Sequence, residues 1–425
     1  MQDNIAGTGK GKVVFITFIF FCLLFSFKVP VFYNSVILSG VVLLLFSITN
    51  LKRAFLNTII SSSYVKIYLF SFIGLVFLVL IYGMLHFTAD FSRLNSVTSN
   101  AIVLAVVLLF CNYLSCAYKN KQVRGLFFCS KYIYYAFSLQ SLIIIFAIIS
   151  PSVLDVVQVF QSPADAGRAE KYEGIRGLAL SGAQFFPLSA VFTLGQLFSV
   201  YYLAFKKKLT LVNVVFFFLI ILAGTTAGRT SLLGALFSLI LLCILSVTHK
   251  EVRPRFIKIL IIGLASLCFL FVLLLSSSYS SLILDVYLPF AFEFIYSYVE
   301  TGKLSTSSTV ILSKMYWSLP LYELTLGYGY YRNDIGNPFM GTDGGYMRNV
   351  LFFGALGVTY VVLAQLSNIY LTYRVNRTEK GVRGFLIVLL FLIFLLHYKG
   401  EVLLHLVSIQ TALFLIFFIP LSFKK

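Results

Sequence analysis

The sequence predicts an all-α membrane protein of about twelve transmembrane helices. Hydrophobic residues make up 60% of the 425 residues, only 11% are charged, and the mean hydropathy is +0.95. Apolar runs long enough to span a bilayer recur along the whole chain, and the connections between them alternate in charge. A water-soluble fold needs polar residues on its outside, whereas lipid can surround an apolar exterior. We therefore expect one polytopic membrane domain over residues 1–425.

The apolar runs define the expected helices, because a spanning helix needs about 20 apolar residues. The first run, 13–28, follows Lys10 and Lys12 as in a signal peptide. No small-residue cleavage site comes after it, so an uncleaved first helix is expected. The other expected spans are 32–49, 66–86, 101–118, 132–149, 178–204, 209–223, 231–247, 257–275, 346–372, 383–397 and 402–421.

Charge then orients these spans. With both termini inside, the inner segments hold 22 basic and three acidic residues, and the outer segments hold 11 basic and 12 acidic residues. Nearly the whole net charge of +18 thus falls on one side, as the positive-inside rule requires. The basic residues orient helices and contact membrane lipids, so the high charge does not indicate a nucleic-acid partner. We expect a bacterial inner-membrane protein with cytoplasmic termini.

Two outer loops exceed a simple turn, 150–177 and 276–345. Long loops above a membrane core are common places for function, so the active site is expected on the periplasmic side. The second loop precedes the last three helices. Its segment 285–300 is dense in aromatic residues, and after Pro289 it is expected to form an amphipathic helix on the membrane surface.

Three arginines lie at the outer ends of expected helices, where the positive-inside rule disfavours them. Arg176 precedes a span, Arg229 lies in Gly-Thr-Thr-Ala-Gly-Arg-Thr-Ser, and Arg348 lies in the first turn of its helix. A guanidinium pairs bidentately with phosphate oxygens, and glycines and a helix N-terminus favour a nearby anion. The alternative is that each arginine contacts lipid headgroups or a loop carboxylate.

Asp343 stands where the long loop re-enters the membrane, ahead of Gly344 and Gly345. A carboxylate there is suited to accept a proton from a hydroxyl nucleophile. It is equally suited to cap the helix that begins near Tyr346, and the two roles are compatible. We keep Asp343 as the candidate catalytic base, with both interpretations open.

Aromatic side chains of the long loop are candidates for contacting a glycan, chiefly Trp317, Tyr328 and Tyr330. Rings stack on sugar faces, although interfacial aromatics are also common membrane anchors. His397, Glu401 and His405 in and after the last outer turn have weak spacing for a metal site, so no metal is expected. Glu401 is expected to be structural.

Three stretches resemble a known family. Ala227-Gly-Arg-Thr-Ser-Leu-Leu-Gly234 resembles the Arg-Thr-Gly-Leu-Leu type segment of bacterial Wzy-type O-antigen polymerases. Gly327-Tyr-Gly329, followed by the segment from Thr342 to Gly357, resembles the end of their long periplasmic loop and the next helix. The layout with a long loop before the last three helices is similar too. The Arg-x10-Gly spacing of some members does not follow Arg176, Arg229 or Arg348.

The resemblance implies a GT-C-like glycosyltransferase that polymerises a surface polysaccharide. A growing glycan on undecaprenyl diphosphate is transferred to a lipid-linked repeat unit at the periplasmic face. Arg176, Arg229 and Arg348 would hold the diphosphate, with Arg229 catalytic, and Asp343 would accept the acceptor's proton. No cofactor or metal is implied. A chain-length regulator and a flippase are the implied protein partners.

Two other functions remain open. An O-antigen ligase has a similar fold and donor but carries a histidine near the end of the long loop, whereas Asp343 stands there in this chain. A lipid-linked oligosaccharide flippase also has about twelve helices. It is expected to keep charges inside its helices and to have short outer loops, unlike this sequence.

Overall fold

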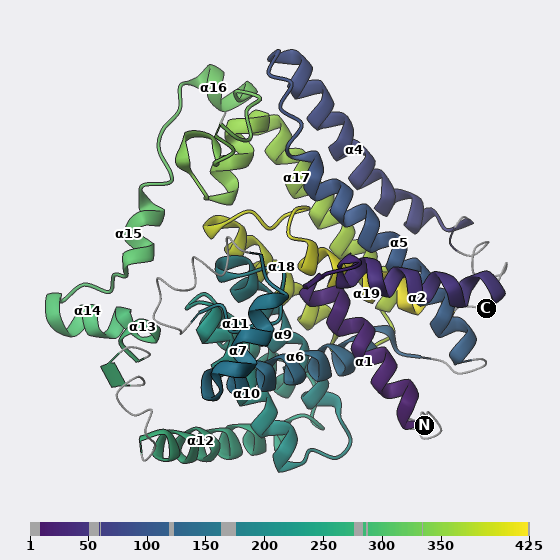
Figure 1. Cartoon of the computed structure of the whole chain (residues 1–425), viewed down its shortest axis with the longest axis vertical. Coiled ribbons are helices and arrows are strands. Elements are labelled where there is room, and N and C mark those ends of the chain that lie inside the picture. The colour runs from purple at the N-terminus through teal and green to yellow at the C-terminus, as the bar shows by residue number, and fades with distance from the viewer. Residues whose placement is uncertain are drawn as a thin grey trace. The chain divides into compact units, whose positions relative to one another are not determined.

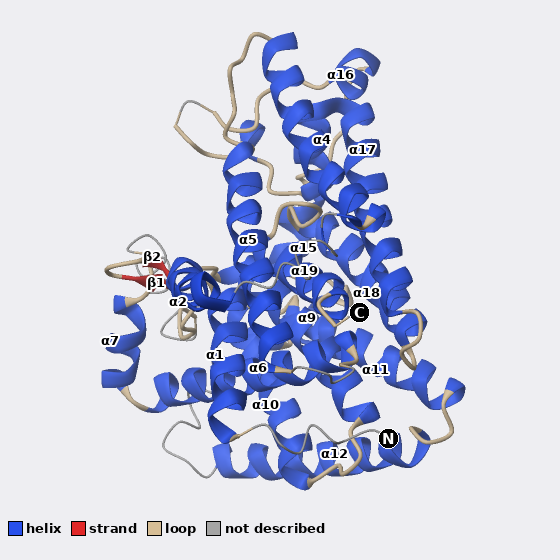
Figure 2. Ribbon diagram, turned by 90° about the vertical axis from the view of Figure 1, so that its right-hand side faces the viewer, coloured by secondary structure: helices blue, strands red, loops and turns tan. Residues whose placement is uncertain are grey.

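Helices dominate the computed structural model, which describes residues 9–50, 59, 61–118, 123–162, 176–275, 284–285, 288–333 and 335–423. Among these residues the one sheet is a short antiparallel hairpin that pairs β1 (Lys28–Val29) with β2 (Tyr33–Asn34), red in Figure 2. The chain divides into two compact units. Unit 1 comprises Met1–Thr49 and Val123–Ile283, and unit 2 comprises Asn50–Gln122 and Leu284–Lys425.

Each unit is formed by two separate stretches of the chain, and these stretches alternate along the sequence. Unit 1 holds α1 (Lys10–Phe25), α2 (Ser35–Asn50), α6 (Gly125–Ile149), α7 (Pro151–Val159), α9 (Phe185–Phe205), α10 (Leu211–Ala227), α11 (Ser231–Thr248) and α12 (Arg253–Leu275). Unit 2 holds α4 (Ser63–Leu85), α5 (Leu94–Ala117), α13 (Leu288–Ala291), α14 (Glu293–Thr301), α15 (Ser307–Ser313), α16 (Leu321–Leu326), η2 (Phe339–Gly341), α17 (Gly345–Asn376), α18 (Val382–Lys399) and α19 (Val407–Leu421).

The chain is an all-α, multi-pass membrane protein. Within the described ranges seven helices are long and apolar enough to cross a membrane: α4, α5, α6, α9, α11, α17 and α18. The apolar helices α2, α10 and α19 are shorter. Each of the twelve expected spans overlaps one helix of the structure. The largest delays relative to the expected starts are in α9, which begins at Phe185, and α19, which begins at Val407.

The long outer loop contains local structure rather than open coil. Its described part forms α13 to α16 and η2. Pro289 lies inside the short helix α13, and α14 follows it. The other expected loop, 150–177, contains α7.

Unit 1 is built around α9, which is buried along almost its whole length. Helices α6, α10 and α11 pack on it. Small residues permit this close approach, because a side chain added at Gly195 would meet the ring of Phe137, and one at Gly234 would meet Thr193 and Gln196. Glycine at a contact between membrane helices lets their backbones pack closely.

Unit 2 is built around α17, which packs on α4, α16, α18 and α19, while α19 packs on α5. Both ribbon views place α17 beside α4 (Figure 1 and Figure 2). Polar side chains inside this core are hydrogen-bonded between helices. Ser71 of α4 bonds to Asn368 of α17, and the Asn376 amide donates to the Ile416 carbonyl of α19.

A kink in α17 joins it to the long loop. Gly354 adopts φ +64° and ψ −174° and interrupts the helix, which frees the carbonyls of Leu351 and Phe352. The amides of Tyr328 and Gly329 donate to these two carbonyls at 2.6 and 3.2 Å. The Gly-Tyr-Gly motif therefore docks on the first turns of α17.

Gly354→Ala should destabilise the protein by about 1–3 kcal/mol, because this backbone conformation is almost restricted to glycine. The added methyl would also collide with the Thr325 carbonyl. We expect a lower midpoint of thermal unfolding in detergent. Gly11→Ala is the control, since nothing lies within 4 Å of its added methyl. Equal midpoints for the two variants would contradict the role of the kink.

Candidate functional site

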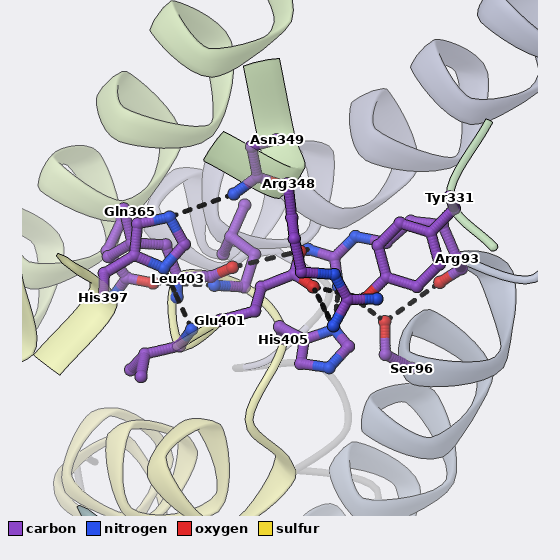
Figure 3. A network of polar contacts seen from close by, with 12 residues as sticks. Arg93, Ser96, Tyr331, Arg348, Asn349, Gln365, His397, Glu401, Leu403 and His405 are labelled. Carbon is purple, nitrogen blue, oxygen red and sulfur yellow. Dashed lines mark hydrogen bonds and ion pairs between the residues drawn. The ribbon is translucent and has the colours of Figure 1, made fainter. Parts of the chain in front are cut away.

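A buried cluster of charges forms in unit 2 from four separate parts of the chain (Figure 3). Arg93 directly precedes α5, Tyr331 lies in the long loop, Arg348 lies in the first turn of α17, and Glu401 follows α18. The Glu401 side chain is only 2% exposed. Its Oε1 lies 3.1 Å from Nη2 of Arg93, and its Oε2 lies 3.7 Å from Nη1 of Arg348.

Tyr331 links the two arginines. Its hydroxyl donates to Oε2 of Glu401, and its ring lies 5.7 Å from Cζ of Arg93 and 4.2 Å from Cζ of Arg348. Burial, followed by the charge of Glu401, raises the pKa of Tyr331, so the phenol remains a neutral donor. Flat guanidinium groups stack favourably on aromatic faces. The ring therefore fixes the plane of each guanidinium.

His405 completes the cluster as a neutral acceptor. Arg93 donates through Nη1 to Nδ1 of His405, so this nitrogen carries no proton and the proton lies on Nε2. The separation of 3.7 Å between Nδ1 of His405 and Oε2 of Glu401 is therefore not an ion pair in this state. The cluster holds two guanidinium groups and one carboxylate.

His397 shapes the turn that carries Glu401. Its Nδ1 accepts hydrogen bonds from the amides of Val402 and Leu403, at 2.9 and 3.3 Å. The proton must then lie on Nε2, which faces the side-chain amide of Asn349 at 3.0 Å. An N–H there needs an acceptor, so we assign the Asn349 oxygen to this contact. A side chain at Gly345 would collide with the His397 carbonyl, so glycine is required there.

Asp90 holds the backbone on both sides of the Tyr331–Arg332 peptide. Its Oδ2 accepts the amides of Tyr331 and Arg332 at 2.6 and 2.9 Å, and its Oδ1 accepts the amide and hydroxyl of Ser92. Partial burial alone would raise the pKa of Asp90, but the hydrogen bonds outweigh it and lower the pKa. A single carboxylate thus joins the α4–α5 connection to the long loop.

Arg176 and Arg229 belong to unit 1, where Arg229 lies in the turn between α10 and α11 and Arg176 lies near it. A methyl on Gly228 would lie 3.9 Å from Nη2 of Arg176 and 3.4 Å from the Ser189 side chain. Arg229 follows Gly228 directly and is partly exposed. The amides of Ser231, Leu232 and Leu233 are bonded within the turn. The turn thus has guanidinium groups of two arginines close to the backbone of Gly228.

The structure corrects two local expectations. Arg176 does not stand directly ahead of a helix, because α9 begins nine residues later at Phe185. Asp343 is not a helix cap, because Gly344 is the N-cap residue of α17 and no side chain bonds to it. Asp343 is exposed, and its side chain makes no hydrogen bond to any of the described residues. It therefore keeps both carboxylate oxygens open to solvent.

The aromatic candidates separate into two places in unit 2. Tyr328 and Tyr330 pack around Phe339, with ring centroids at 5.6 and 5.4 Å. Trp317 is 39% exposed. Its neighbour Tyr316 instead stacks on Tyr398 and donates to the Tyr398 carbonyl, which ties the loop to the end of α18. Tyr328 and Tyr330 thus form a partly exposed aromatic surface.

One member of the buried cluster was missed from sequence, and another was not singled out. Arg93 was not considered, and Tyr331 was counted only among the aromatic residues of the long loop. Glu401 was expected to be structural. The positive-inside rule singles out Arg93 as much as Arg176, because Arg93 lies in the outer connection between two expected spans. No such signal exists for Tyr331, one of 26 tyrosines.

Comparison with known proteins adds no family assignment. No protein-family model matches the chain, and no curated protein matches it significantly. In the part of the chain that is described, no group of three His, Cys, Asp or Glu side chains could hold a metal ion. The function must therefore be inferred from the residues themselves.

Glu401→Ala should destabilise the protein by about 3–5 kcal/mol, because it leaves Arg93 buried without its counter-charge. Loss of thermal stability in detergent measures this effect. Glu300→Ala on the exposed helix α14 is the matched control and should change stability by no more than about 0.5 kcal/mol. Similar behaviour of the two variants would show that the cluster does not stabilise unit 2.

Asp90 should make stability depend on acid pH. Its folded-state pKa is lowered, so its contribution is present above the unfolded pKa of about 3.9 and is lost as the pH falls through the lower folded value. We expect the thermal midpoint of wild type to fall more steeply below about pH 4 than that of Asp90→Asn. Parallel pH profiles would rule out the carboxylate as the group that holds the loop.

Proposed function

We propose that the chain is an O-antigen, or surface-polysaccharide, polymerase of the bacterial inner membrane. It transfers a growing glycan from undecaprenyl diphosphate to a lipid-linked repeat unit on the periplasmic side. The observation that carries the proposal is the turn between α10 and α11. There Nη2 of Arg176 lies 3.9 Å from where a methyl on Gly228 would be, and Arg229 is the next residue in the chain. Only 11% of the residues are charged, so two arginines near one turn are unusual. Two guanidinium groups at a glycine turn suit a diphosphate.

The topology follows from the charge pattern. Twelve spans with cytoplasmic termini put Arg176, Arg229, Asp343 and Arg348 on the outer side. The proposal is supported by the correspondence between the twelve apolar runs and twelve helices. A GT-C-like architecture is part of this proposal, with the long loop standing before the last three helices.

The reaction needs a leaving-group site and a base. The acceptor hydroxyl oxygen attacks the anomeric carbon of the donor glycan, and the bond from that carbon to the diphosphate oxygen breaks. The diphosphate leaves with the electron pair, and arginines stabilise the negative charge. In unit 1 the arginines proposed for this role are Arg176 and Arg229. In unit 2 Arg348 is proposed for the same role, and exposed Asp343 is the proposed acceptor of the hydroxyl proton. Trp317, Tyr328 and Tyr330 offer rings to the glycan.

An O-antigen ligase is the second candidate, because a histidine does approach the end of the long loop in space. The His397 ring packs edge-on against Tyr346, with centroids at 4.5 Å, and its Nδ1 lies 2.7 Å from where a methyl on Gly345 would be. His397 is fully buried and hydrogen-bonded at both ring nitrogens. A structural role for it favours the polymerase.

Deleting the gene in its host and separating the surface polysaccharide on a gel tests the proposal. A ladder that collapses to core plus one repeat unit supports the polymerase. Loss of all repeats from the core, with long glycan retained on the lipid carrier, indicates a ligase. Loss of outward-facing repeats altogether indicates a flippase, and an unchanged ladder contradicts all three.

Complementation locates the site. Arg229→Ala should reduce polymerisation by about a hundredfold or more at normal protein level, because a donor to the leaving group is removed. Arg377→Ala, an exposed arginine at the other end of α17, is the control and should restore the full ladder. A full ladder with Arg229→Ala would exclude that arginine from the reaction.

A further inference from the structure

The charges of the buried cluster in unit 2 do not balance. Arg93 and Arg348 bring two positive charges, Glu401 brings one negative charge, and Tyr331 and His405 are neutral. The nearby Asp90 carboxylate adds a second negative charge, but its oxygens accept four hydrogen bonds from Ser92, Tyr331 and Arg332. The two arginines therefore share the single carboxylate of Glu401 inside the cluster, and Arg93 lies closer to it than Arg348 does.

Arg93 is not the group that would meet this ligand. Its side chain is fully buried, pairs with Glu401 at 3.1 Å and donates to Ser96, His405 and the Leu403 carbonyl. Both of its Nη atoms are therefore directed to partners within the cluster, and its Nε–H is buried. Glu401 is likewise occupied, since Tyr331 donates to the same oxygen that faces Arg348.

Arg348, unlike Arg93, is partly exposed and only loosely paired. Its side chain is 15% exposed, it reaches Glu401 only at 3.7 Å, and its side chain makes no hydrogen bond among the described residues. The Nε–H is buried without an acceptor in the described part of the chain. The Tyr331 ring at 4.2 Å covers one face of the guanidinium, which leaves its edge to present N–H groups. Such an edge pairs bidentately with phosphoryl oxygens.

The position of Arg348 on its helix adds to this preference. It lies in the first turn of α17, a helix of 32 residues whose N-cap has no side-chain partner. The helix dipole favours negative charge at this end. We propose that Arg348 is the contact group of a phosphoryl-binding site in unit 2, and that Glu401 and Tyr331 are positioning residues that hold its guanidinium there. The site deepens, and rests on, the proposed use of a lipid-linked diphosphate.

Binding to the purified full chain in detergent tests the site. Inorganic pyrophosphate and farnesyl diphosphate are titrated by calorimetry, so that a free phosphoryl group and a lipid-linked one are compared. Wild type should bind both, and Arg348→Gln should weaken both by about tenfold or more, as expected for loss of charge-assisted hydrogen bonds. Tighter binding of farnesyl diphosphate would identify the lipid-linked source, and equal binding the free phosphoryl group.

Matched variants separate positioning from folding. Arg332→Gln changes an exposed arginine of the same loop and should bind like wild type. Tyr331→Phe keeps the ring and should retain most of the affinity, whereas Tyr331→Leu removes the stacking surface and should lose affinity at an unchanged elution profile. Wild-type affinity in Arg348→Gln, or an equal loss in Arg332→Gln, would overturn the proposal.

A footprint on the wild-type chain avoids the risk that a variant misfolds. Phenylglyoxal modification, read by mass spectrometry, should be suppressed at Arg348 by saturating pyrophosphate and unchanged at Arg332. Equal modification of Arg348 with and without pyrophosphate would overturn the site. Pyrophosphate binding together with an unchanged polysaccharide ladder would keep the site and reject the polymerase. A collapsed ladder without pyrophosphate binding at Arg348 would keep the polymerase and reject the phosphoryl-binding site.

Discussion

The buried carboxylate of Glu401 contacts groups from three other parts of unit 2. Arg93 comes from the α4–α5 connection, Tyr331 from the long loop, Arg348 from α17, and the carboxylate itself from the turn after α18. A buried carboxylate is stable only with paired charges and satisfied hydrogen bonds, so these segments must arrive together. The docking of the long loop, the kink of α17 and the shape of the last turn all serve this arrangement.

The surrounding contacts show how the arrangement is enforced. Asp90 fixes the backbone beside Tyr331, Gly354 opens α17 to the amides of Tyr328 and Gly329, and His397 organises the turn that carries Glu401. Each contact is a backbone hydrogen bond made by a side chain or by a helix interruption. The result is a rigid frame in which Arg348 is the one arginine of the cluster with an exposed edge. In the proposed reaction, hydrogen-bond donors held in place would stabilise the negative charge that develops on the departing diphosphate.

Sequence patterns predicted the helices well and the cluster poorly. Apolar runs and charge alternation locate helices because lipid imposes both, and each expected span overlaps a helix. Boundaries were less certain: Phe185 begins α9 later than the apolar run at 178, since hydropathy does not mark where a backbone turns. The Gly-Tyr-Gly motif was singled out by resemblance, and its docking on the kink at Gly354 explains why glycines stand there. Arg93 and Glu401 lie far apart in the sequence, and only the fold brings them together.

The most direct measurement is the reaction itself. The purified protein in detergent is given undecaprenyl-diphosphate-linked repeat units in the presence of EDTA, and the products are sized by mass spectrometry. A polymerase of the proposed kind should form glycans of two or more repeat units on the lipid carrier, with one undecaprenyl diphosphate released for each bond formed. Repeat units that remain single, under conditions where the protein is folded and binds the lipid, would contradict the proposed activity.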